Sequence, residues 1–135
     1  MATALVVYEG ELHTVATHLK SGSAIHTDAP TDNFGKGEAF SPTDLMATSL
    51  ANCILTTMGI KCNQNNWNID GTSIEVTKIM GTDPRRIVGI DAIVKFPKGD
   101  YDLKTRTILE RTAVTCPVAM SFHPDIQQNI IFHWD

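Results

Sequence analysis

The 135-residue sequence has few features of a membrane or nucleic-acid-binding protein. Its 11 basic residues are outnumbered by 15 acidic ones. Apart from the pair Arg85-Arg86 they are scattered, which argues against a surface for nucleic acid or anionic lipid. No uninterrupted apolar run approaches the roughly 18 residues that span a bilayer. The first residues lack the basic start and apolar core of a secretory signal, so we expect a cytoplasmic protein.

Motifs for metals, phosphates and serine nucleophiles are also missing. The chain has no CxxC or HxxxH pattern, and its five histidines fall on separate expected elements, so we expect no bound metal or other cofactor. It has no glycine-rich phosphate loop and no serine nucleophile motif. Three cysteines remain, and in a reducing compartment they should be free thiols. A functional hypothesis for this chain rests on two of these cysteines, Cys53 and Cys116.

One long helix is expected over the stretch from Ser41 to Asn63. Ser41 suits the N-cap, Pro42 the first helical position, and Asp44 can return a capping bond to the amide of Ser41. A helix without a polar face is expected to be buried in a core. This one is apolar almost all round, through Leu45, Met46, Ala47, Leu50, Ala51, Ile54, Leu55, Met58 and Ile60.

The pattern of the remaining chain predicts an α+β fold in a single domain over residues 1–135. Antiparallel sheets are expected to cover the helices, and residues 28–40 form the longest loop. Alternating apolar residues and turn signals predict an N-terminal antiparallel meander of strands at 3–9, 12–19 and 23–27, a hairpin of strands at 67–79 and 87–96, and a last strand at 127–134. Helices are expected at 103–114 and, more briefly, after residue 116.

The three cysteines differ in the partners that they can reach. Cys62 lies nine residues after Cys53, about 13.5 Å along the same helix and on its opposite face, which excludes a disulfide between them. Cys116 is the better partner: it precedes Pro117 at the expected start of a helix, where free amides lower a thiol pKa. The alternative is that these cysteines are only small core hydrophobes. His123 could act as a base, or could simply face solvent at a helix end.

Two motifs resemble the OsmC/Ohr family, which contains osmotically inducible and organic hydroperoxide resistance proteins. They are SPTDLMATSLANC, with a proline eleven residues before Cys53, and CPVAMSFHP around Cys116. The order of elements extends the resemblance over nearly the whole chain. Within the family the combination is most similar to the YhfA-like branch.

The resemblance implies an intertwined homodimer of OsmC-like fold, with N-terminal strands packed on the partner and active sites at the interface. It implies a peroxiredoxin-like oxidoreductase of the oxidative stress response, in which Cys53 is the peroxidatic thiol and Cys116 the resolving one. The small-molecule partners would be an organic or hydrogen peroxide and an external dithiol such as dihydrolipoamide. The apolar helix wall would accept the alkyl tail of the peroxide.

The resemblance also implies an activating arginine from the N-terminal region and a glutamate just after the helix-start proline. Thr43 occupies the position of that glutamate, with Asp44 one residue later. No arginine precedes Arg85, so Lys20 or Lys36 would have to supply the positive charge. A lysine is a point charge and lacks the planar fork of arginine.

Without that arginine and glutamate, we expect the apolar surroundings of Cys53 to raise its thiol pKa. Two alternatives to a peroxidase follow from this expectation. The protein could be a non-catalytic dimer of the same fold that binds a small apolar ligand. It could also be a redox sensor that forms a disulfide without turnover.

Overall fold

The computed structural model describes all residues from Met1 to Asp135. They form two compact units, Met1–Met46 and Ala47–Asp135. The two sheets and the helices confirm the predicted α+β class, while a single folding domain stays a prediction. In order, the elements are β1 (Ala4–Gly10), β2 (His13–His18), β3 (Ala24–Asp28), the 3₁₀ turn η1 (Thr31–Asn33), α1 (Pro42–Asn65), β4 (Ser73–Gly81), β5 (Arg86–Lys95), α2 (Leu103–Val114), α3 (Pro117–Ser121) and β6 (Gln127–His133).

The N-terminal unit contains the predicted three-stranded meander. β1 pairs antiparallel with β2, and β2 pairs antiparallel with β3. Gly10, at a φ of +88°, begins the turn between β1 and β2, a conformation that glycine adopts without steric cost. Four consecutive apolar side chains of β1 stay more than half exposed: Leu5, Val6, Val7 and Tyr8.

The start of α1 is fixed by the capping box that the sequence predicts. The Ser41 N–H donates to Asp44 Oδ2 at 3.0 Å, and the Asp44 N–H donates to Ser41 Oγ at 3.0 Å. The two residues thus satisfy each other's backbone amides at a helix end, where amides lack intrahelical partners.

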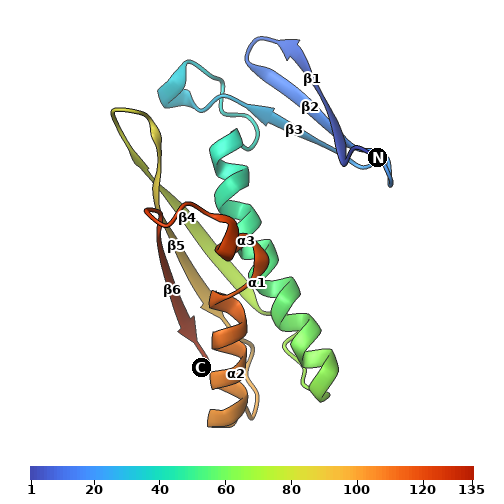
Figure 1. Ribbon diagram of the computed structural model, residues 1–135, viewed down its shortest axis with the longest axis vertical. Coiled ribbons are helices and arrows are strands. Elements are labelled where there is room, and N and C mark those ends of the chain that lie inside the picture. Colours follow the sequence, from blue (N-terminus) through green and yellow to red (C-terminus); the bar gives the residue numbers. More distant parts are fainter. The chain divides into compact units, whose positions relative to one another are not determined.

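The C-terminal unit is built on the sheet β4-β5-β6. Figure 1 shows α1, α2 and α3 on the same side of this sheet. β4 and β5 form the expected antiparallel hairpin, but β6 pairs with β5 in parallel, so this sheet is mixed rather than wholly antiparallel. The parallel pairing follows from connectivity, because α2 and α3 form a crossover that returns the chain to the same end of the sheet.

α1 is the core helix of the C-terminal unit, although only one of its faces is buried. By length and composition alone it could also cross a membrane, a test that core helices of soluble proteins pass too. The expectation of burial all round is wrong: Ile60 is 55% exposed. The sheet and the other helices of the unit cover one stripe, at the three-to-four-residue spacing of a helix face. The stripe comprises Ala47, Leu50, Ala51, Ile54, Met58 and Cys62.

The end of α1 explains a second difference from the predicted elements. Asn66 adopts a left-handed conformation at φ 58°, and the Trp67 N–H donates to the Cys62 carbonyl at 3.0 Å. This is a Schellman ending. A turn closed by Thr72 on the carbonyl of Ile69 follows, so β4 begins at Ser73 and the predicted strand residues 67–72 form a loop.

Candidate functional site

Cys53 lies in the middle of α1, and its side chain is half-buried. Its Sγ accepts a hydrogen bond from the backbone N–H of Val118, 3.5 Å away. Val118 belongs to the first turn of α3, so the contact joins two segments that are 65 residues apart. The fold therefore places the Cys53 sulfur at the start of the short helix that follows the second cysteine motif.

Cys116 is the N-cap of α3, with Pro117 at the first helical position, as the sequence predicts. Its side chain makes no capping hydrogen bond and is fully buried. The amides at a helix start lack intrahelical acceptors, and here one of them, that of Val118, is directed at Cys53. The amides of Ala119 and Val118 at this helix start do lower the pKa of Cys116, as expected, but burial outweighs them, and the Val118 amide also donates to Cys53.

The Cys53 thiol has a lowered pKa, which corrects the expectation of a raised one. Burial by itself raises the pKa, but three neutral donors outweigh it: the N–H of Val118, the hydroxyl of Thr57 and the thiol of Cys116. Thr57 Oγ1 lies 3.7 Å from Cys53 Sγ, one helical turn further along α1. Hydrogen bonds to the charged form of an acid favour that form, so these donors favour thiolate at Cys53.

The Cys116 thiol has a raised pKa, again opposite to the expectation. Burial is the main cause, and the adjacent Cys53 sulfur adds to it by hydrogen bonding and by charge repulsion. Two thiolates side by side would repel each other, so the proton stays on the more buried sulfur. The pair is therefore asymmetric, with the anion favoured at Cys53 and the proton at Cys116.

Cys62 stands apart from this pair as a core thiol. It is almost completely buried, and burial together with the charge of Asp70 raises its pKa. All three cysteines are free thiols, as expected. A buried thiol with a raised pKa is a poor nucleophile.

The four proposed supporting residues lie in the N-terminal unit. Asp44 takes part in the capping box, and Thr43 Oγ1 lies 3.3 Å from the hydroxyl of the N-cap serine. Lys36 is paired with Glu11 at 3.4 Å, and Lys20 is exposed in the turn after β2. A role of these residues beside Cys53 stays a prediction.

His123 fits the solvent-exposed alternative. Its side chain is exposed, and its Nδ1 accepts a hydrogen bond from the Asp125 N–H at 3.0 Å. The imidazole thus stabilises the turn after α3 by accepting this backbone hydrogen bond.

Two contributors to the site escaped the sequence analysis. Thr57 follows Cys53 by four residues, and that helical spacing was a usable signal for a hydroxyl on the same face. Val118 acts through its backbone N–H, so no side-chain motif could have indicated it.

A separate cavity of about 560 Å³ lies in the C-terminal unit and contains neither Cys53 nor Cys116. Trp67, Tyr101 and Asp102 are among the residues that line it. The polarised thiols make the cysteine pair, and not this cavity, the candidate reactive site. The pocket for an alkyl tail stays a prediction.

Potential metal ligands gather in the N-terminal unit, although the sequence shows no ligand motif. Single ligand atoms of Glu9, His13 and His26 all lie within 4.8 Å of one another. His13 and His26 fall on separate strands, and strand pairing brings them together. The expectation that all five histidines lie on separate elements is wrong, because His13 and His18 share β2.

Comparisons with known proteins agree with this architecture. The family model described as OsmC-like protein matches residues 35–130. A crystal structure of a candidate osmotic stress induced and detoxification response protein from Psychrobacter arcticus is 54% identical, covers 98% of this chain and 96% of its own, and superposes with a TM-score of 0.95. A search of curated proteins found no match.

More distant solved structures share the fold. The organic hydroperoxide resistance protein OsmC from Legionella pneumophila is 12% identical with a TM-score of 0.75, over 98% of this chain and 97% of its own. A candidate organic hydroperoxide resistance protein from Vibrio cholerae, with captopril bound in one of its active sites, is 12% identical with a TM-score of 0.74, over 98% of this chain and 92% of its own.

Proposed function

Because the chain belongs to the OsmC-like protein family, we propose that it is a thiol-dependent peroxidase that reduces organic or hydrogen peroxides. In this proposal Cys53 is the attacking thiol and Cys116 the resolving one. The observation that carries it is the hydrogen bond from the Val118 amide to Cys53 Sγ, which favours thiolate at the half-buried sulfur of the pair. Thiolate, and not thiol, is the nucleophile in such chemistry.

In the first step the Cys53 thiolate attacks the terminal oxygen of the hydroperoxide. A sulfur–oxygen bond forms, the oxygen–oxygen bond breaks, and the alkoxide leaves with a proton as an alcohol. Cys53 is oxidised by two electrons to a sulfenic acid, and the peroxide is reduced by the same two electrons. The three donors that stabilise the thiolate, from Val118, Thr57 and Cys116, are neutral, so they act by hydrogen bonding and not by a formal positive charge.

In the second step Cys116 resolves the sulfenic acid. Its sulfur attacks Cys53 Sγ, the disulfide forms, and the hydroxyl of the sulfenic acid leaves with the Cys116 proton as water. The raised pKa of Cys116 suits this order of events. Once Cys53 is a neutral sulfenic acid, the negative charge that held the proton on Cys116 is gone, and its thiol becomes easier to deprotonate.

Recycling requires an external dithiol, which is oxidised to a disulfide while Cys53 and Cys116 return to thiols. We expect no bound cofactor.

The exposed apolar side chains of β1, at Leu5, Val6 and Val7, support the proposal of a homodimer, because covering them with a second subunit would be favourable in free energy. A cytoplasmic setting would keep the thiols reduced.

The test is consumption of cumene hydroperoxide in the presence of dihydrolipoamide. The wild-type protein and a Cys62→Ser variant should both turn over, and a Cys53→Ser variant should be inactive. Cys62→Ser is the matched control, since it removes a thiol from the same helix without altering the pair. Equal consumption by the wild type and Cys53→Ser would contradict the proposal.

The same assay distinguishes the alternatives. A single round of disulfide formation without recycling by several dithiols would indicate a redox sensor. No reaction, combined with saturable binding of small apolar molecules, would indicate a binding protein.

A further inference from the structure

We infer that Glu9, His13 and His26 form a Zn²⁺ site on one face of the N-terminal sheet. Each of the three strands β1, β2 and β3 supplies one ligand. The site lies within a single compact unit and uses none of the cysteines. It does not depend on the proposed peroxidase activity.

Strand register brings the ligands together. His13 in β2 lies opposite Asp28 in β3, and Val15 lies opposite His26. Residues that face each other across an antiparallel pair share a face, as do residues two apart along a strand. His13, His26 and Asp28 therefore share one face of the sheet. The register of β1 on β2 shifts between Tyr8 and Gly10, and Glu9 lies at this irregularity, at the end of β1 next to His13.

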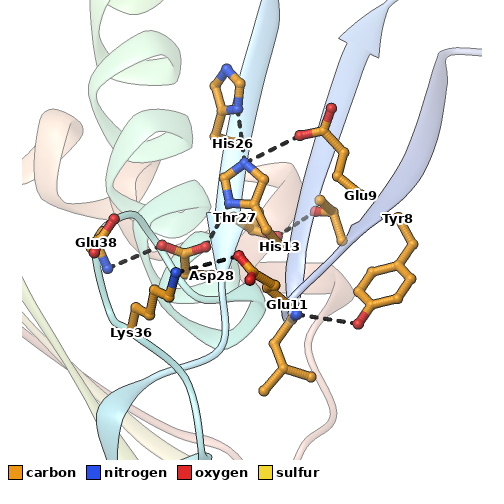
Figure 2. Close-up of polar contacts among 11 residues, drawn as sticks. Tyr8, Glu9, Glu11, His13, His26, Thr27, Asp28, Lys36 and Glu38 are labelled. Carbon is orange, nitrogen blue, oxygen red and sulfur yellow. Dashed lines mark hydrogen bonds and ion pairs between the residues drawn. The ribbon is translucent and has the colours of Figure 1, made fainter.

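The two separations from His13 Nε2 to the other ligand atoms fit a tetrahedral ion, and all three ligand atoms lie within 4.8 Å of one another. His13 Nε2 lies 3.2 Å from His26 Nδ1 and 3.5 Å from Glu9 Oε1. Zn–N bonds of 2.0–2.1 Å at tetrahedral angles place neighbouring ligand atoms about 3.3–3.4 Å apart. An octahedral ion with bonds of the same length would need about 3.0 Å. Figure 2 shows the Glu9 carboxylate and the His26 ring both directed at one nitrogen of His13.

Asp28 acts as the supporting carboxylate behind the site. The Nδ1–H of His13 donates to Asp28 Oδ1 at 2.5 Å, and the second carboxylate oxygen accepts the Glu38 N–H at 3.1 Å (Figure 2). The Asp28 side chain is buried, and the two hydrogen bonds that it accepts hold it in place behind His13. A proton fixed on Nδ1 leaves the lone pair of His13 Nε2 for a metal, an arrangement typical of zinc-binding histidines.

The contacts around His13 Nε2 also need a positive charge. With its lone pair turned outward, this nitrogen would face the negatively charged Glu9 at 3.5 Å, which is unfavourable. A metal ion bound between the two ligand atoms removes the conflict. The metal also uses the Nδ1 lone pair of His26, and the partial exposure of His13 and the exposure of the other two ligands leave a fourth position for water.

The test is calorimetric titration of Zn²⁺ into the full-length protein after dialysis against a chelator. We expect one site per chain, and we expect His26→Ala and Glu9→Gln each to weaken binding at least about tenfold. Both positions are exposed, so the fold should tolerate the changes. The control is His18→Ala, because His18 is also exposed in the N-terminal sheet but contacts Ser21 instead of the site.

Two further arms make the result decisive. Thiols bind zinc, so the titration is repeated in Cys53→Ser, where one site per chain should remain. Co²⁺ in place of Zn²⁺ should give the intense visible absorption of a tetrahedral site, and this absorption should be lost in His26→Ala. Absence of saturable binding, or equal weakening by His18→Ala and His26→Ala, would overturn the inference.

Discussion

The Val118 N–H donates to Cys53 Sγ across 3.5 Å and 65 residues of sequence. This hydrogen bond joins the two cysteine motifs directly, because its donor lies two residues after Cys116. The hydrogen bond favours thiolate at Cys53, although Thr43 occupies the position where the resemblance implies a glutamate. The polarity comes from a backbone amide, which substitutions at side chains leave in place.

Replacing Thr57 by valine should raise the pKa of the Cys53 thiol. The change removes the hydroxyl 3.7 Å from the sulfur and keeps the shape of the side chain. A net hydrogen bond is worth about 1 kcal/mol, so the shift should be at most about one pH unit. It would appear as a displaced pH profile for alkylation of Cys53 by iodoacetamide.

Thr56→Val is the matched control for that measurement. Its hydroxyl donates to the carbonyl of Asn52 at 2.8 Å, on the exposed side of the same helix. The two variants share the same effect of valine on helix stability, so only Thr57→Val should shift the profile. Equal displacement by both would mean that the Thr57 hydroxyl does not stabilise the thiolate.

Limited alkylation near neutral pH should label Cys53 before the other two cysteines. Its pKa is lowered and its side chain is accessible, whereas Cys116 and Cys62 are buried and have raised pKa values. Peptide mass spectrometry after substoichiometric iodoacetamide measures the order. Labelling of Cys116 first would reverse the assignment of attacking and resolving thiols.

The sequence was sufficient for the elements whose patterns are local. The capping box at Ser41 and Asp44 and the N-cap role of Cys116 depend only on neighbouring residues, and both are confirmed. The predicted strand 67–79 includes the loop before β4, because the left-handed Asn66 and the Schellman ending that it permits leave no alternation signal. The parallel β5–β6 pairing depends on a crossover between distant segments, which periodicity does not reveal.

The candidate site was harder to predict than the fold. Burial and helix position suggested pKa shifts for Cys53 and Cys116 that are both the reverse of those in the structure. The reason is physical: a thiol pKa depends on which donors the fold aims at the sulfur, and the decisive donor here is the backbone of Val118. The cluster around His13 was missed for a similar reason, since its ligands come from three strands.

Asp102→Asn should remove a pH-dependent part of the stability while keeping the cap of α2. Asparagine is as good an N-cap as aspartate. The Thr105 backbone amide, which donates to Asp102 Oδ1 at 2.8 Å, is the main cause that holds the Asp102 pKa below its usual value of 3.8. A depressed carboxyl pKa stabilises the fold above the unfolded value and ceases to do so as the pH falls through the folded one.

Wild type should therefore exceed Asp102→Asn in free energy of unfolding at pH 7, and the difference should shrink below about pH 4. Urea unfolding at a series of pH values measures both. Asp100→Asn, which removes the same charge from a neighbouring exposed carboxylate, is the matched control. A constant difference between wild type and Asp102→Asn at all pH values would contradict the charge-based account.

Cys116→Ser should separate the oxidation of Cys53 from its resolution. Without the second sulfur no disulfide can form, so one equivalent of cumene hydroperoxide should leave Cys53 as a sulfenic acid that dimedone traps. The variant also loses the Cys116 thiol and its contribution to the lowered pKa of Cys53, but a serine hydroxyl can still donate to the thiolate. Oxidation should therefore slow only modestly, whereas turnover with a dithiol should fall strongly unless the dithiol itself attacks the sulfenic acid.

A Cys62→Ser variant treated in the same way should form the disulfide and bind no dimedone. Dimedone labelling at Cys62 in the Cys116→Ser protein, or none at Cys53, would show that the oxidised sulfur had been wrongly assigned.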